Sequence, residues 1–169
     1  MTISMYNASV PVFKQMLGGL NQVLAKADAH AAEKKIDPGV LVQSRLFPDM
    51  FPLSRQVQIA CDFAKGVSAR LAGIEVPVYE DKEQTLPELR ALITKTIAFI
   101  DGIDPAKFDG SAQREIITRP GTPREKKFLG VAYLLSYGLP QFFFHITTAY
   151  ALLRHNGVAI GKPDYMGAF

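Results

Sequence analysis

The chain has 169 residues, of which 48% are hydrophobic and 21% are charged, and its formal net charge is +3. These values predict one globular domain spanning residues 1–169, and they exclude both a disordered chain and a strongly basic nucleic-acid-binding protein. The single cysteine, Cys61, excludes an internal disulfide and is typical of a reducing, cytoplasmic compartment.

The first predicted helix begins after Ser9, a suitable N-cap, and ends before the turn at residues 37–39. Its apolar residues recur at helical spacing: Phe13, Leu17, Leu20, Leu24 and Ala27. Gly18 and Gly19 lie within it, and each costs about 1 kcal/mol relative to alanine, which is tolerable where another helix or a ligand approaches closely. Residues 40–49 are expected to form a connector that lies on the bundle.

The second predicted helix runs from Met50 to about Ala72, with an apolar stripe that faces inward. This stripe consists of Leu53, Val57, Ala60, Cys61, Ala64, Val67 and Leu71. Gln58 and Asp62 lie one turn apart on a neighbouring face. They are expected in solvent or at a helix–helix boundary, or alternatively turned toward the interior.

A third helix begins at a capping box formed by Thr85 and Glu88, and it carries its own apolar stripe inward. Residues 104–127 are different, because they are rich in Asp, Gly, Pro and charge. They contain a short β-type run at 114–118, with which residues 127–129 could pair. This segment predicts a small hairpin or flap that is locally basic and solvated.

The last predicted helix runs from Pro140 to Gly157, and a shorter apolar helix at 131–137 leads into it. One stripe of the last helix is formed by Gln141, His145, Thr148 and Leu152. A polar stripe bordered by apolar residues fits a helix that lines a pocket. His145 is therefore either a core histidine satisfied by one hydrogen bond or part of a ligand or metal site.

No Asp, Glu, Lys or Arg occurs between Phe128 and Leu153, and this stretch is long enough to cross a membrane. Gly, Pro, Ser, Thr, Gln and His interrupt it, so we expect two buried segments that meet at Pro140 and no membrane span. The tail after Gly157 carries little charge, and we expect it to pack against the bundle or against a second subunit.

Four long helical patterns separated by connectors predict an all-α four-helix bundle. The runs FFFHITTAYALLRHNGV and GKPDY, together with PDMFPLSRQ and ARLAG earlier in the chain, resemble domain-of-unknown-function family 1993. That family is similar to the DinB/YfiT-like four-helix bundles. The resemblance implies this bundle arrangement and a homodimer, and the residues themselves add the short β-hairpin or flap before the last helix.

Many members of the wider group carry a metal on three histidines, one from the second helix and two at HxxxH spacing in the last helix. The shared residues 153–154 set the register, which places His145 on the second histidine of the HxxxH pair and Gln141 on the first. The second-helix ligand falls near Gln58. Amide oxygens are weak ligands for zinc or nickel, so we expect no tight metal site, and any labile Zn or Ni would be held by His145.

Two functions follow from these residues. The first is a non-metal binding or interaction protein, a homodimer with a degenerate pocket that could bind a small molecule. That pocket would be lined by His145, Gln141, Thr148, Gln58 and Asp62. The alternative is a transferase or hydrolase in which His145 acts as general base, oriented by Asp62 or a glutamine, or holds a labile metal. No nucleic-acid or membrane partner is expected.

Overall fold

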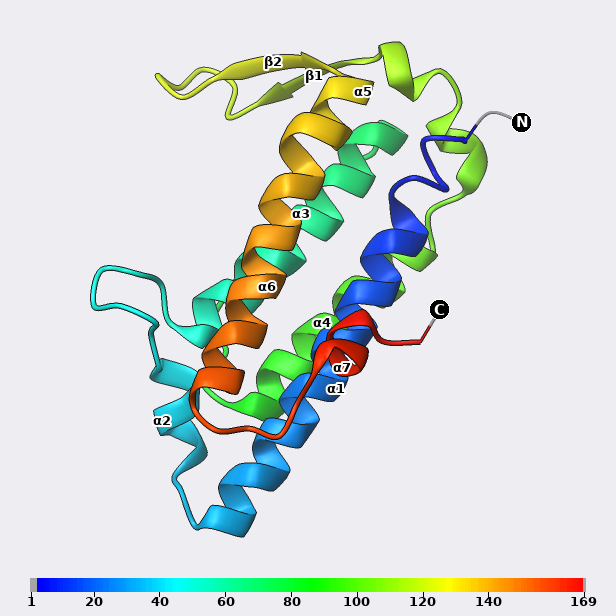
Figure 1. Ribbon diagram of the computed structural model, residues 1–169. Helices are drawn as coiled ribbons and strands as arrows, with labels where there is room; N and C mark the ends of the chain where they lie inside the picture. The colour runs from blue at the N-terminus through cyan, green and yellow to red at the C-terminus, as the bar shows by residue number, and fades with distance from the viewer. Residues whose placement is uncertain (1–2, 169) are drawn as a thin grey trace.

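The predicted apolar stripes form the buried faces of a four-helix bundle in the computed structural model, which describes residues 3–168 (Figure 1). The last long helix is the end of a longer helical rod, because α5 and a π-helix precede it without a break. The bundle elements are α1 (Val10–Lys34), α3 (Leu53–Ala72), α4 (Leu86–Asp101), α5 (Gly130–Ala132), the π-helix (Tyr133–Gly138) and α6 (Leu139–His155).

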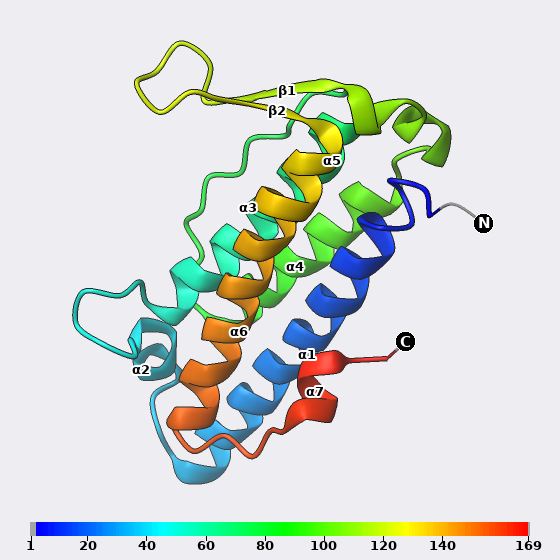
Figure 2. The same cartoon turned by 45° about the horizontal axis from the view of Figure 1, so that its top comes forward.

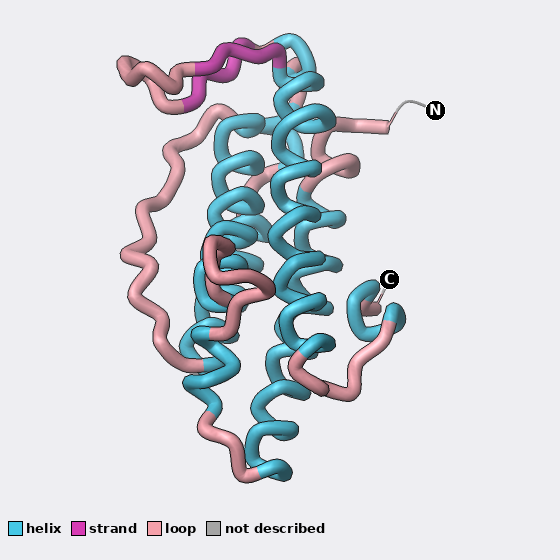
Figure 3. The backbone as a smooth tube through the Cα atoms, turned by 60° about the vertical axis from the view of Figure 1, so that its left-hand side comes forward, coloured by secondary structure: helices cyan, strands magenta, loops and turns pink. Residues whose placement is uncertain are grey.

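Among the long helices, both α1 and α3 pack mainly against α4 and α6, and they also contact each other. Helices α3 and α4 run in the same direction (Figure 2), so residues 73–85 must return along the length of the bundle before α4 can begin. Figure 3 shows this segment as an extended strap along one side. Because α3 is about 30 Å long and an extended chain covers about 3.3 Å per residue, residues 73–85 can span that distance.

The predicted helix ends are confirmed in part. Thr85 Oγ1 accepts a hydrogen bond from the backbone N–H of Glu88, and the Glu88 carboxylate accepts one from the backbone N–H of Thr85. These two bonds complete the capping box. Ser9 occupies the N-cap of α1, but its hydroxyl donates to the carbonyls of Met5 and Tyr6 instead of accepting from the helix. The buried hydroxyl thereby finds a partner in the preceding turn.

The connector predicted at residues 40–49 is wrong in its first part, because α2 (Pro38–Gln43) forms there. Asp37 caps this short helix, because its carboxylate accepts a hydrogen bond from the backbone N–H of Gly39 at 2.8 Å. The turn signal at 37–39 therefore marks the start of α2 as well as the end of the first helix. The second long helix begins at Leu53, later than predicted, because Pro52 restricts Phe51 to extended backbone.

The prediction that two segments meet at Pro140 is also wrong. Gly138 and Leu139 both have right-handed helical backbone, so the rod continues from Gly130 to His155. Proline lacks an N–H, and the wider π-helix just before it accommodates the lost hydrogen bond. Ser136, whose carbonyl would lose its partner, is exposed and can bond to water.

The hairpin predicted before the last helix is confirmed as β1 (Glu115–Thr118) and β2 (Lys126–Leu129), which pair antiparallel with Ile116 opposite Phe128. Two short 3-10 turns, Pro105–Phe108 and Ser111–Gln113, precede it. In Figure 1 the hairpin lies across one end of the bundle, above α5.

The tail was expected to pack either against the bundle or against a second subunit, and it packs against the bundle. Residues 162–166 form α7 (Lys162–Met166) beside α1 (Figure 2). A Cβ on Gly19 would lie 2.8 Å from the carbonyl oxygen of Tyr165, so the glycine permits this close approach. Gly18 faces open space. Within the described residues, no helix is long and apolar enough to cross a membrane.

Candidate functional site

His145 lies on the inner side of α6, with 7% of its surface exposed, and it faces α3. Its Nδ1 is 2.7 Å from Oε1 of Gln56. The amide nitrogen of Gln56 donates to the carbonyl of Phe51 at 3.2 Å, which leaves the Gln56 oxygen to accept. Nδ1 is therefore assigned as the protonated nitrogen, and the tautomer of the ring is fixed by the neighbouring helix.

The environment of the ring favours the neutral imidazole. Burial, and then the positive charge of Arg55, lowers the pKa of His145 from 6.5 to about 4. Phe63 stacks on the ring with centroids 6.1 Å apart, and Phe144 meets it edge-on at 5.2 Å. A desolvated cation between aromatic rings and near an arginine is disfavoured, so His145 is uncharged at neutral pH.

The other predicted pocket residues do not surround His145. Gln58 donates to the Glu83 carboxylate at 3.0 Å and accepts from Arg55, so it faces the strap of residues 73–85. Asp62 pairs with Lys65 at 2.8 Å.

The predicted residues on α6 are also engaged differently. The Thr148 hydroxyl donates to the carbonyl of Phe144 in its own helix at 2.7 Å. Gln141 is half-buried one turn before His145. The five residues predicted to line one pocket are therefore distributed over several environments, and only His145 lies at the α3–α6 contact with a side-chain partner from α3.

Gln56 is the partner that the sequence analysis missed. It occupies a position three residues after Leu53 and four before Ala60, which places it within the buried stripe of α3. A glutamine on an otherwise apolar stripe requires an internal hydrogen-bond partner. That signal is present in the sequence, whereas the register of the family resemblance points to Gln58, which lies on a neighbouring face.

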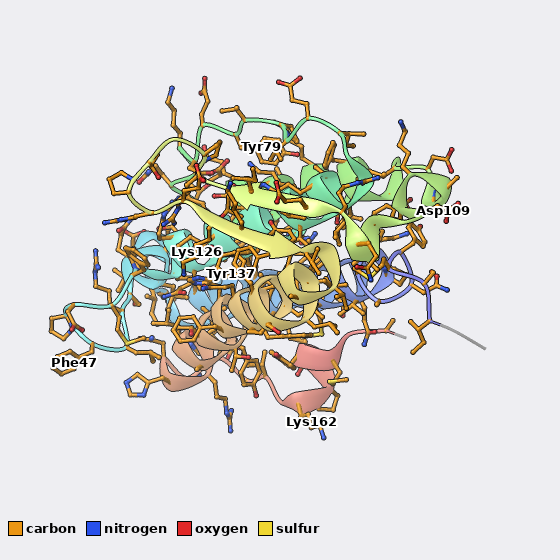
Figure 4. The ribbon with its side chains drawn as sticks, turned by 90° about the horizontal axis from the view of Figure 1, so that it is seen from above. Phe47, Tyr79, Asp109, Lys126, Tyr137 and Lys162 are labelled. Carbon is orange, nitrogen blue, oxygen red and sulfur yellow. The ribbon has the colours of Figure 1, made fainter. Side chains whose placement is uncertain are left out.

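A cavity lies beside the contact between His145 and Gln56, and it is lined by α3, the strap, the π-helix and the hairpin. Its volume is about 660 Å³, within the range of small-molecule sites. Figure 4 looks down on this end of the molecule, with Tyr79 on the strap and Tyr137 below the strands. Of the five predicted pocket residues, Asp62 alone lines the cavity.

The long side of the cavity is one face of α3, running from Arg55 past Phe63 and Gly66 to Arg70. These positions follow helical spacing, so one helix presents charged, aromatic and small residues to the same space. Four of the cavity's charged residues form two ion pairs, because Arg55 bonds Asp81 at 2.6 Å and Lys65 bonds Asp62.

Aromatic rings connect the cavity to the histidine. Tyr133 and Tyr137 of the π-helix stack with centroids 5.8 Å apart, and Tyr137 contacts Phe63 at 5.8 Å. Phe63 in turn covers His145. The rings form a continuous row between the hairpin end and the α3–α6 contact, and Phe63 separates the imidazole from the cavity.

Tyr79 fixes the strap to the bundle. Two ammonium groups contact its ring, with Lys65 Nζ at 3.8 Å and Lys95 Nζ at 4.1 Å from the centroid. Cation–π contacts of this kind contribute about 0.5–2 kcal/mol each, more when the cation is desolvated. Because Lys65 is buried, this contact helps to hold the outer wall of the cavity in place.

Cys61 does not supply a nucleophile. Its side chain is buried within α3, and burial raises the pKa of the thiol to about 12. The reactive thiolate is therefore not populated at neutral pH. This agrees with the expectation of a core cysteine.

The three-histidine metal site that the fold resemblance implies does not fit these residues. Among residues 3–168, no group of three or more His, Cys, Asp or Glu side chains could hold a metal ion. Gln56 of α3 already occupies Nδ1 of His145, and the residue one turn before His145 on α6 is Gln141. Amide oxygens are poor ligands for zinc and nickel.

Comparison with known proteins agrees with this architecture. A crystal structure of a DinB family member protein from Shewanella denitrificans matches the chain with a TM-score of 0.91 and 44% sequence identity, over 98% of this chain and 93% of that one. No curated protein matches significantly. The family described as Domain of unknown function (DUF1993) matches residues 5–166. The fold is thus a DinB-like four-helix bundle, and the chain belongs to the DUF1993 family.

Proposed function

We propose that this protein is a non-metal, small-molecule-binding DinB-like bundle in which the ancestral metal position is degenerate. The observation that carries the proposal is the 2.7 Å hydrogen bond between His145 Nδ1 and Gln56 Oε1. It joins the helices that would each supply metal ligands, and it satisfies both polar groups without an ion. The adjacent cavity of about 660 Å³ provides the space for a ligand.

Catalysis by His145 as a general base has weaker support. An imidazole with a pKa of about 4 is unprotonated at neutral pH but is a weak base, and the efficiency of a general base falls as its pKa drops below the working pH. Asp62, one of the two kinds of residue expected to orient the imidazole, bonds Lys65 instead, whereas a glutamine, Gln56, does hold Nδ1. The transferase or hydrolase alternative therefore has an orienting partner for His145 but lacks the basicity that a general base requires.

The metal content of protein purified without chelator tests the proposal. We expect wild type, His145→Ala and His155→Ala to contain no stoichiometric metal, with no stabilisation on adding zinc or nickel. His155→Ala is the matched control, because it removes an exposed histidine from the same helix. Stoichiometric zinc or nickel in wild type and His155→Ala, but not in His145→Ala, would overturn the proposal.

We also propose that the protein is a homodimer that pairs through the outer face of the α5–α6 rod. Val131, Leu135 and Phe144 expose 37%, 54% and 57% of their surfaces there. Because the rod has no Asp, Glu, Lys or Arg before Arg154, two copies can meet without like charges facing each other. Sedimentation should give a dimer for wild type and for Val40→Glu on α2, and a monomer for Leu135→Glu. A monomeric wild type would contradict this assignment.

A further inference from the structure

The cavity beside α3 contains two arginines that no acidic side chain neutralises. Arg70 and Arg119 both line it, and neither forms an ion pair within 4 Å among the described residues. The other two cations of the lining, Arg55 and Lys65, are already paired with carboxylates. The hairpin end of the cavity is therefore its electropositive end.

Arg70 is held against the protein and does not extend into solvent. Its guanidinium lies over Gly66, where an added Cβ would be 2.7 Å from Nη1. The same nitrogen donates to the Tyr133 hydroxyl at 3.2 Å. A half-buried guanidinium with only a neutral partner keeps most of its five donors free. An anion that bonds it would recover desolvation energy that the protein alone leaves uncompensated.

Arg119 approaches the same end from the hairpin. Its backbone has φ 51°, a left-handed conformation that costs a non-glycine residue roughly 1 kcal/mol or more. The residue follows Thr118, whose side chain is buried and also lines the cavity. The turn thus holds a second cation at the rim, where it can contact the outer side of a bound anion.

The wall next to Arg70 is aromatic. Tyr133 and Tyr137 stack with an interplanar angle of 25°, and Phe128 supports both rings at 5.7 and 5.1 Å. Tyr133 and Tyr137 lie four residues apart in the π-helix, so both rings are on the same side of the rod. Burial raises the pKa of Tyr133, so its hydroxyl stays neutral and can donate. Such a wall favours a flat, unsaturated ligand.

We infer that this cavity binds a small aromatic carboxylate, with its carboxylate against Arg70 and Arg119 and its ring against Tyr137, which the buried Tyr133 supports from behind. The guanidinium fork matches a carboxylate in a bidentate arrangement. The assignment rests on the proposed role as a small-molecule-binding protein, and it names the chemical class of the ligand.

Calorimetric titration of the full chain with 2-naphthoate, in buffer with EDTA, tests the inference. We expect one naphthoate per chain, at least tenfold weaker binding of uncharged 2-naphthamide, and at least tenfold weaker binding of inorganic phosphate. Arg70→Gln should weaken naphthoate binding about 10–100-fold, as expected for the loss of a charge-assisted pair. Arg154→Gln, which removes an exposed arginine at the far end of α6, should change it less than twofold.

Arg119→Gln provides a second variant at an exposed position, and we expect it to weaken naphthoate binding several-fold without unfolding the protein. Absence of naphthoate binding, or equal affinities in wild type, Arg70→Gln and Arg119→Gln, would overturn the assignment. Equal binding of naphthamide would also overturn it, because the cavity would then be an apolar site. Naphthoate binding that required added zinc would instead overturn the proposed metal-free function.

Discussion

The neutral state of His145 makes the stability of the bundle depend on pH in a defined window. Its pKa is lowered from 6.5 to about 4 in the folded protein. Between those values the unfolded chain binds a proton that the folded chain does not bind. Folding stability therefore falls as the pH decreases from about 6.5 toward about 4, and this contribution is complete above the unfolded pKa.

The size of the effect follows from the two pKa values. The full shift corresponds to roughly 3 kcal/mol, and lowering the pH from 7 to 5 costs about 2 kcal/mol of that total. With a urea dependence of about 2 kcal/mol per molar, the midpoint should move by about 1 M through His145 alone. Aspartate and glutamate residues also titrate in acid, so the contribution must be isolated by a variant.

His145→Gln is the appropriate variant, because the new amide can still donate to Gln56 and cannot titrate. Urea unfolding should be followed by circular dichroism between pH 4 and pH 8. We expect the stability of wild type to fall more steeply below pH 6.5 than that of His145→Gln, by about 2 kcal/mol at pH 5. His155→Gln should follow wild type. Parallel curves for wild type and His145→Gln would refute the assigned burial of a neutral imidazole.

Three further predictions concern the scaffold. Gly18→Ala should stabilise the protein by up to about 1 kcal/mol because position 18 faces open space. Gly19→Ala should destabilise it by about 1–3 kcal/mol because the new Cβ would clash with the backbone of α7. Urea unfolding measures both changes, and a change of stability in the same direction for the two variants would contradict the packing. Thr85→Ala should cost about 1 kcal/mol in the same assay, with Thr94→Ala as the exposed control on α4. Cys61 should react with Ellman's reagent only at the rate of unfolding in native buffer, and rapid labelling would contradict its burial.

The helices were predictable because each one carries its own repeating stripe. The apolar residues of α1 and α3 recur every three or four positions, and every member named for those stripes is buried. Local chemistry also determined the capping box at Thr85 and the hairpin pairing. The errors, α2 and the rod through Pro140, occurred where short-range signals for a turn coincide with a helix start or a π-helix.

The site was less predictable because it depends on contacts between elements that are distant in the sequence. The partner of His145 is separated from it by 89 positions, and a two-residue difference on α3 decides whether Gln56 or Gln58 faces α6. The cavity has an outer wall made by the strap, whose path depends on α3 and α4 running in the same direction. Periodicity specifies the buried face of a helix, but it does not specify its neighbours.

The histidine and the proposed anion site share one helix but should behave independently. Arg55, near His145, and Arg70, at the electropositive end, are separated by four helical turns, which is about 22 Å along α3. The imidazole stacks on Phe63, about 10 Å along α3 from Arg70, and screening with a length of about 8 Å at physiological ionic strength weakens the field of a carboxylate at Arg70 over such a distance. Arg55 is also neutralised locally by Asp81 at 2.6 Å. Burial, which no ligand at the far end changes, remains the dominant cause of the low histidine pKa. The hydrogen bond between His145 and Gln56 therefore satisfies the helix contact by itself, and the cavity lies apart from it.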